Sequence, residues 1–155
     1  MEMIAEALAI VGVIACAALV FVFWAALPVV IPLQFDMYGN ISSYGPRSEL
    51  LKPLAIGLLI YILLTIVIVF RERIISIFRL TNRLSPKKFS IYRAMIAWFK
   101  AEIVWSCALL EVVPISAAFY NSHALTMILP LPAVIFVLTI LYYGATLIRP
   151  TTLNS

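Results

Sequence analysis

The stretch PLAIGLLIYILLTIVIVF occupies residues 53–70, and the basic segment RERIISIFR follows it directly at residues 71–79. The first segment is uncharged and long enough for a helix to cross the roughly 30 Å hydrocarbon core of a bilayer. Pro53 suits the first turn of that helix, where its missing N–H would have no partner in any case. The abrupt change at Arg71 indicates where the helix leaves the membrane. The stretch therefore predicts an integral membrane protein.

The composition of the whole chain agrees with this interpretation. Hydrophobic residues make up 65% of the 155 residues and charged residues 12%, whereas a soluble domain has roughly half and about 25% respectively. This composition excludes three classes of protein: a soluble enzyme, a disordered tail and a nucleic-acid-binding domain. Its length allows one domain with four spans and short connections.

Three further apolar stretches complete the predicted membrane domain, an all-α fold of four transmembrane helices. Pro28 and Pro32 are expected to end the first span, and Pro130 and Pro132 to kink the start of the fourth. Because the connections are short, neighbouring spans should be antiparallel and form a four-helix bundle. The predicted spans cover residues 5–27, 53–70, 94–118 and 125–148.

The basic residues predict the orientation of the chain. Eight of the 11 Lys and Arg residues lie between residues 71 and 100, where Glu72 is the one opposing acid. By the positive-inside rule the loop at residues 71–93 faces the cytoplasm. Both termini then also face the cytoplasm, and residues 28–52 lie outside. We expect a multi-pass protein of a prokaryotic plasma (inner) membrane.

The basic loop also predicts contact with lipid. Residues 71–84 have the spacing of an amphipathic extension of the second span, and Ser85-Pro86 is typical of the start of a helix. Each base near an anionic surface contributes on the order of 1 kcal/mol of attraction. An acidic protein partner is an alternative, while nucleic acid is not expected. The candidate headgroup-binding residues are Arg79, Arg83, Lys87 and Lys88.

Glu111 is the most informative single residue, because it lies deep in the third span, where an ionised carboxylate is expensive. We expect it to face the bundle interior, either as a proton, cation or peptide-amine site or as a packed side chain held by Tyr61 or Thr65. Lys100 is expected to extend to the cytoplasmic surface. Glu102 falls on the opposite side of the same helix and is expected to be solvated or paired within the basic loop.

The segment between the first two spans has its own pattern, LPVVIPLQFDMYGN at residues 27–40. After Pro32, apolar and polar residues alternate with the period of a β-strand. Gly39-Asn40 and Tyr44-Gly45-Pro46 are turn signals. These features predict a short hairpin or compact cap over residues 28–52 at the outer end of the bundle.

This segment resembles the domain of unknown function 1648, which forms the N-terminal part of SdpI-type proteins. The resemblance covers about a third of the chain. The chain differs at Gln34, Ser42 and Arg47, where the family usually has His, an acid and Lys. The resemblance implies a small polytopic membrane protein with an outer cap, from a family that includes immunity to, and sensing of, a secreted peptide toxin. The matching positions are Leu27, Pro28, Ile31, Pro32, Phe35, Gly39, Tyr44, Gly45 and Arg47.

Two functions remain open from the sequence. In the first, the protein is not an enzyme and binds a peptide, protein or lipid at its outer cap, in the manner of the SdpI type. In the second, it is a structural accessory subunit of a larger membrane complex, with Gly144 packed against a partner helix. A small transporter or membrane enzyme is a weaker alternative. No cofactor or metal is expected. The candidate binding residues are Phe35, Asp36, Tyr44, Arg47 and Glu111, with Glu49 and Lys52 as further polar contacts.

Overall fold

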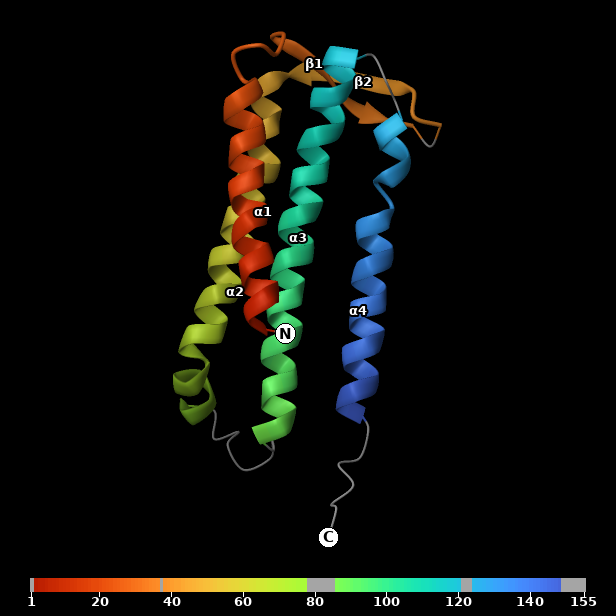
Figure 1. The fold of residues 1–155 in the computed structure, drawn as a ribbon. Coiled ribbons are helices and arrows are strands. Elements are labelled where there is room, and N and C mark those ends of the chain that lie inside the picture. Colours follow the sequence, from red (N-terminus) through yellow and green to blue (C-terminus); the bar gives the residue numbers. More distant parts are fainter. Residues whose placement is uncertain (1, 37, 78–85, 121–123, 149–155) are drawn as a thin grey trace.

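The computed structural model describes residues 2–36, 38–77, 86–120 and 124–148, and four long helices dominate it (Figure 1). Helices that follow one another along the chain run in opposite directions, as their short connections require. Each is long and apolar enough to cross a membrane, alone or with the short helix before it. The predicted set of four membrane-capable helices is therefore confirmed. The helices are α1 (Glu2–Phe23), α2 (Leu51–Ile77), α3 (Pro86–Tyr120) and α4 (Leu131–Ile148).

The ends of the helices differ from the predicted spans. α1 ends at Phe23, earlier than expected, because the chain must turn before it enters the first strand. α2 continues to Ile77, so part of the predicted extension of the second span is helical. The fourth segment is broken rather than kinked: a 3-10 helix, η3 (Ala124–Ile128), precedes α4. Pro130 and Pro132 lack the N–H groups that would continue a single helix through this point.

A two-stranded antiparallel sheet lies across one end of the helices, which we call the hairpin end (Figure 1). It consists of β1 (Val30–Phe35) and β2 (Ile41–Pro46), and a 3-10 helix, η1 (Arg47–Leu50), joins it to α2. The register pairs Val30 with Pro46 and Phe35 with Ile41, with irregularities around Gln34. The predicted hairpin cap is thus present. α4 ends towards the opposite end of the molecule, and α1 begins short of that end (Figure 1).

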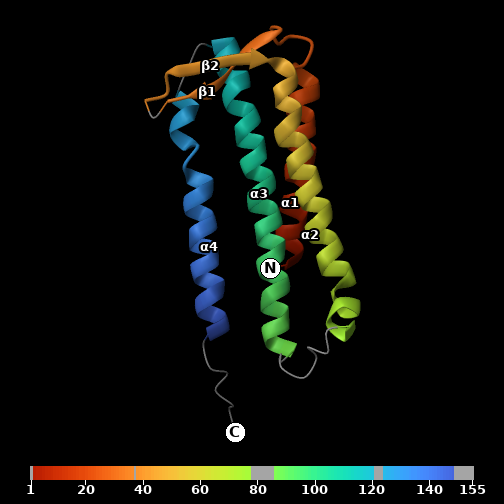
Figure 2. The same cartoon turned by 180° about the vertical axis from the view of Figure 1, so that it is seen from behind.

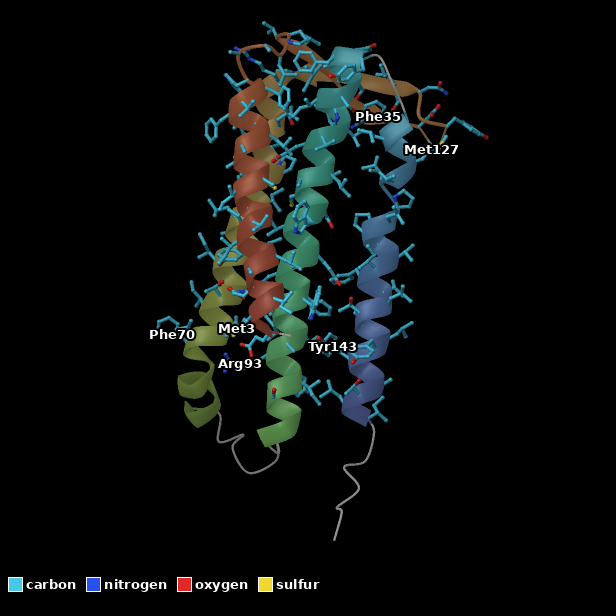
Figure 3. All side chains as sticks on the ribbon, in the orientation of Figure 1. Met3, Phe35, Phe70, Arg93, Met127 and Tyr143 are labelled. Atoms are coloured by element: carbon cyan, nitrogen blue, oxygen red, sulfur yellow. The ribbon has the colours of Figure 1, made fainter. Side chains whose placement is uncertain are left out.

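The predicted bundle is present in part: α1, α2 and α3 pack together, and α4 lies at the side of α3. α3 packs extensively on α1 and also contacts α2 and α4. Seen from behind, α4 stands beside α3 and away from α2 (Figure 2). Tyr143 is the buried residue of α4 and lies between α4 and α3 (Figure 3). A single neighbour leaves most of α4 facing outward.

Small side chains explain why α1 and α3 pack so closely. The buried face of α1 carries Ala5, Ala9, Gly12 and Cys16 at intervals of three and four residues. Ala97, Ala101 and Ala108 are buried on α3. Small residues at helical spacing let two backbones approach, which is how helices associate where lipid removes the hydrophobic driving force. The regular spacing of small residues in α1 is the signal in the sequence from which this contact could have been predicted.

Candidate functional site

Arg47 anchors the cap to the end of α1. Its Nη1 donates to the carbonyl oxygens of Trp24 at 2.8 Å and Leu27 at 3.1 Å, and its guanidinium lies 4.9 Å from the centre of the Trp24 ring. The Arg47 backbone N–H also donates to the Val29 carbonyl at 3.0 Å. Carbonyls that a helix end leaves unbonded thus gain a charged donor. Arg47 was predicted to contact a ligand, but its side chain holds the cap against the end of α1.

Asp36 organises the turn between the strands. Its Oδ1 accepts from the backbone N–H groups of Tyr38 and Asn40, both at 2.8 Å, and its Oδ2 accepts from the Asn40 side-chain amide at 2.9 Å. Gly39 has a φ of 86°, a conformation that favours glycine. The hydrogen bonds from the Asn40 side chain and backbone hold the pKa of Asp36 below its usual value. Asp36 is therefore engaged within the cap, and Arg47 is engaged with the end of α1.

One side of the cap packs on the helices, and the other side is exposed. Ile31 lies in a buried cluster with Val20, Leu27, Leu50 and Ile115, which joins the hairpin to α1, η1 and α3. On the other side of the sheet Tyr44 is 64% exposed and Val30 is 55% exposed, and Tyr38 in the turn is 84% exposed. Phe35 is half-buried at the hairpin end, on the same side as Met127 of η3 (Figure 3).

Glu111 lies inside the helix core, as the sequence predicted. It is fully buried, and neither carboxylate oxygen has a hydrogen-bond partner among the described residues. Cys16 and Cys107 are the free, buried thiols in its electrostatic surroundings. A carboxyl group in such surroundings is far less costly when it carries its proton, because an unpaired charge there would lose its hydration without compensation.

Tyr61 and Thr65, the expected partners of Glu111, instead form hydrogen bonds with Glu6 and Lys100. Tyr61 donates to Glu6 Oε1 at 3.4 Å, and Thr65 accepts from Lys100 Nζ at 3.2 Å. α2 runs antiparallel to α3 and places Gly57 against Cys107. Residues that follow Gly57 in α2 therefore lie level with Lys100, and Glu111 is about 16 Å further along α3.

Lys100 does not extend to the surface, contrary to expectation. It is 1% exposed, donates to Glu6 Oε1 at 2.6 Å and lies 4.9 Å from the centre of the Tyr61 ring. Glu6 of α1 supplies the counter-charge, so the side chain does not need to reach water. Closer to the end opposite the hairpin, Arg93 forms an ion pair with Glu2, so two acid–base pairs join α1 to α3.

Glu102 is neither solvated nor paired in the basic loop. Its Oε1 accepts a hydrogen bond from the Thr139 hydroxyl of α4, and its buried Oε2 has no partner among the described residues. The rings of Phe99 and Phe136, whose centres are 4.8 Å apart, form a second contact between α3 and α4. This hydrogen bond is a polar contact that attaches α4 to α3.

Two of the predicted headgroup-binding residues, Arg79 and Arg83, lie outside the described residues. Lys87 and Lys88 belong to the first turn of α3, and their side chains lie outside the described part as well. Within the described residues there is no group of three or more His, Cys, Asp or Glu side chains that could hold a metal ion.

Comparison with models of known protein families, with curated proteins and with solved structures gave no match to this chain. The resemblance of residues 27–47 to the domain of unknown function 1648 stays a prediction.

Proposed function

We propose that this protein is a non-enzymatic, multi-pass membrane protein that binds a protein or peptide partner at its cap. One observation carries the proposal: hydrogen bonds hold the hairpin in place, and the same hairpin exposes aromatic side chains. Arg47 and Asp36 fix the backbone of the cap through five hydrogen bonds of their side chains. A surface that is already ordered loses little conformational entropy when a partner binds.

The chemistry of the exposed side fits a peptide or protein rather than an ion. Tyr38, Tyr44 and Val30 project from the cap and are all more than half exposed. Tyrosine offers a large apolar ring together with one hydroxyl, and such side chains dominate the energetics of protein interfaces. The roles of the candidate residues are accordingly divided: Tyr44 and Phe35 for contact, Asp36 and Arg47 for support.

Two sequence features support a cap that faces outward and meets a secreted partner. The concentration of bases at residues 71–100 favours a cytoplasmic location for the opposite end of the molecule. The resemblance to the SdpI type favours recognition of a peptide at the outer face. The proposed location is the plasma membrane, with both termini inside.

The second candidate is an accessory subunit, and one observation favours it. α4 contacts α3 alone among the long helices, apart from minor contacts, and a Cβ atom added at Gly144 would meet nothing within 4 Å. A partner helix could approach α4 closely at this open position. This function uses a different surface, so one experiment separates it from the first.

Photo-crosslinking in membranes of the expressing cells tests both functions. The photoreactive residue benzoylphenylalanine is placed at Tyr44 in one variant and at Tyr142 in a matched variant. Tyr142 is similarly exposed, at 59%, but lies on α4. We expect a discrete adduct with a protein or peptide from Tyr44, and loss of that partner from pull-downs when Tyr44→Ala is introduced. A stoichiometric protein adduct from Tyr142 without one from Tyr44 would replace the cap-binding function with the subunit function.

A further inference from the structure

One edge of the hairpin is not covered by another described element. β1 contacts α3 and η1 as well as β2, whereas β2 has only minor contacts with described elements other than β1. In Figure 2, β2 crosses the end of the bundle from the start of α2 towards α4. A strand at the edge of a sheet presents backbone N–H and C=O groups that can pair with a further strand. We call this side of β2 the open edge.

The hydrogen bond next to the sheet shows which backbone groups lie on the open edge. The Arg47 N–H donates to the Val29 carbonyl at 3.0 Å, so these two residues form a hydrogen-bonded pair of the antiparallel ladder. Hydrogen-bonded and non-hydrogen-bonded pairs alternate along such a ladder. The register then makes Tyr44 and Pro32 a non-hydrogen-bonded pair, so the backbone groups of Tyr44 point away from β1. Pro46 has a position of the same kind, where its missing N–H costs no hydrogen bond within the sheet.

The other end of β2 follows the same rule. The Asp36 N–H donates to the Asn40 carbonyl at 2.8 Å, so the next pair, Phe35 with Ile41, is a non-hydrogen-bonded pair. The irregularities in the register bring Ile41 and Tyr44 to the same edge, although they are three positions apart. Within the described part of the chain, no hydrogen bond from outside the sheet reaches the backbone of these two residues. Each of them therefore offers one donor and one acceptor on the open edge.

The open edge is suited to pair with a copy of itself. Residues 41–46 have the sequence ISSYGP and carry no charged side chain, whereas edge strands that avoid pairing commonly carry one. Two such strands therefore meet without charge repulsion. A two-fold axis places Ile41 of each copy opposite Tyr44 of the other. Each of these pairs can exchange two backbone hydrogen bonds, so the donors and acceptors of the edge match without a second kind of sequence.

The place of β2 in the molecule permits this contact in a membrane. The sheet lies across the ends of the helices (Figure 1), so β2 runs along the membrane plane when the helices span the bilayer. Copies in one membrane share an orientation, and a two-fold axis along the membrane normal makes their open edges antiparallel at one level. The exposed Asp36 and the surface ion pair of Glu49 with Lys52 flank the strand. They favour a position in the polar region, since open sheet edges do not occur in the hydrocarbon core.

We propose that two copies of this chain associate through the open edges of β2 and form a continuous antiparallel sheet across the hairpin end of a symmetric dimer. The pairing goes beyond the function proposed for the cap, because it uses the backbone of β2, whereas partner binding uses the exposed rings. The dimer gives the donors and acceptors of Ile41 and Tyr44 partners within the protein, in place of water. A different peptide or protein on this edge is the alternative occupant.

Disulfide crosslinking of the purified full chain in phosphatidylcholine liposomes tests the proposal, because no other protein is present there. In the proposed pairing the axis passes between Ser42 and Ser43 of the two copies, so Ser42→Cys should give mainly a disulfide-linked dimer on mild oxidation with copper phenanthroline. Ser48→Cys is the matched control: residue 48 is also exposed but lies in η1, outside the strand, and this variant should stay mainly monomeric. Cys16 and Cys107 are buried and should not react. Monomer from both variants, or equal amounts of dimer from both, would overturn the proposal.

Variants at Tyr44, made in the Ser42→Cys protein, separate backbone pairing from side-chain contact. Tyr44→Pro removes the N–H on the open edge but no hydrogen bond to β1, so it should abolish the crosslink. Tyr44→Ala keeps this N–H and should retain the crosslink, although it removes the ring used in the proposed function. If Tyr44→Pro fails to fold, the α-hydroxy acid analogue of tyrosine at this position removes the same N–H, keeps the ring and should weaken the crosslink. A crosslink that survives loss of the N–H, or one that is lost with Tyr44→Ala, contradicts pairing through the backbone.

Discussion

At the scale of single residues, the Glu6–Lys100 pair shows how the core tolerates a buried cation. Lys100 is almost fully buried, whereas the Glu6 side chain is 34% exposed. Removing one member of a buried pair costs more than removing both, because a charge is left without its partner. Lys52 and Glu49 form an ion pair at the surface. Removing one member of that pair should cost less, because the remaining charge is still solvated.

We predict that Glu6→Gln lowers the free energy of unfolding by about 3 kcal/mol, because the buried Lys100 is left without its counter-charge. The double variant with Lys100→Met should recover at least half of that loss. Chemical unfolding of the four members of this double-mutant cycle in detergent measures the coupling. Lys52→Met is the control and should cost less than about 1 kcal/mol. Independent, additive effects of the two substitutions would refute the pairing.

The turn at Asp36 should depend on pH in a defined direction. Its pKa is lowered, first by the Asn40 side-chain amide and then by backbone N–H groups. A group with a depressed folded-state pKa stabilises the fold above its unfolded pKa, and this contribution is lost as the pH falls through the lower folded value. The cap turn should therefore loosen only below the model-peptide value of 3.8.

We expect Asn40→Ala to raise the pKa of Asp36 towards its usual value, because the largest cause of the shift is removed. A carbon-13 NMR titration of the Asp36 carboxyl group measures this directly. Glu49→Gln, at a residue that is not among the causes of the shift, serves as the control and should leave the Asp36 titration unchanged. An unchanged Asp36 titration would show that the turn does not form.

At the scale of secondary-structure elements, the contact of α1 with α3 depends on one missing side chain. A Cβ atom at Gly12 would lie 2.9 Å from Val104 Cγ1 and 3.2 Å from Trp105 Nε1. Val104 is β-branched and has little rotameric freedom in a helix, so the backbones would have to separate. At Gly144 of α4 the same addition meets nothing within 4 Å.

The two glycines therefore form a matched test. Alanine gains about 1 kcal/mol of helix propensity over glycine at either position. We predict that Gly144→Ala is neutral or stabilising, while Gly12→Ala is destabilising by about 1 kcal/mol because overpacking outweighs the propensity. Unfolding of both variants in the same detergent gives the comparison. If Gly12→Ala proves as stable as Gly144→Ala, the close α1–α3 approach is wrong.

At the scale of the whole molecule, α4 is the least integrated helix. It meets the bundle through α3, with Tyr143 buried and Thr139 bonded to Glu102. Segments with few buried contacts open at lower free energy than the rest of a protein. The cap and the other three helices, in contrast, share the cluster that contains Ile31, Leu50 and Ile115.

We predict that the amides of α4 exchange with deuterium before those of α1 and α3 when the protein is held in detergent. Thr139→Val should accelerate exchange in α4 and leave α1 unchanged, because it removes the hydrogen bond to Glu102 without touching the three-helix bundle. Hydrogen-exchange mass spectrometry of both proteins gives the comparison. Uniform acceleration throughout the chain would mean that the four helices open as one unit.

Features that depend on one segment of the chain could be predicted from the sequence, whereas contacts between distant segments could not. The four membrane-capable helices, the start of α3 at Pro86 and the hairpin between α1 and α2 were predicted, because apolar run length, proline position and turn residues act within one segment. The sequence did not predict the hydrogen-bond partners of four side chains, those of Lys100, Glu102, Tyr61 and Thr65. They depend on the rotation and level of helices that are apolar on all sides and so carry no pattern that points to a neighbour. Glu6 meets Lys100 across 94 positions and Thr139 meets Glu102 across 37. Close packing of small residues on α1 and α3 sets those levels, and the packing exists only once the helices have come together.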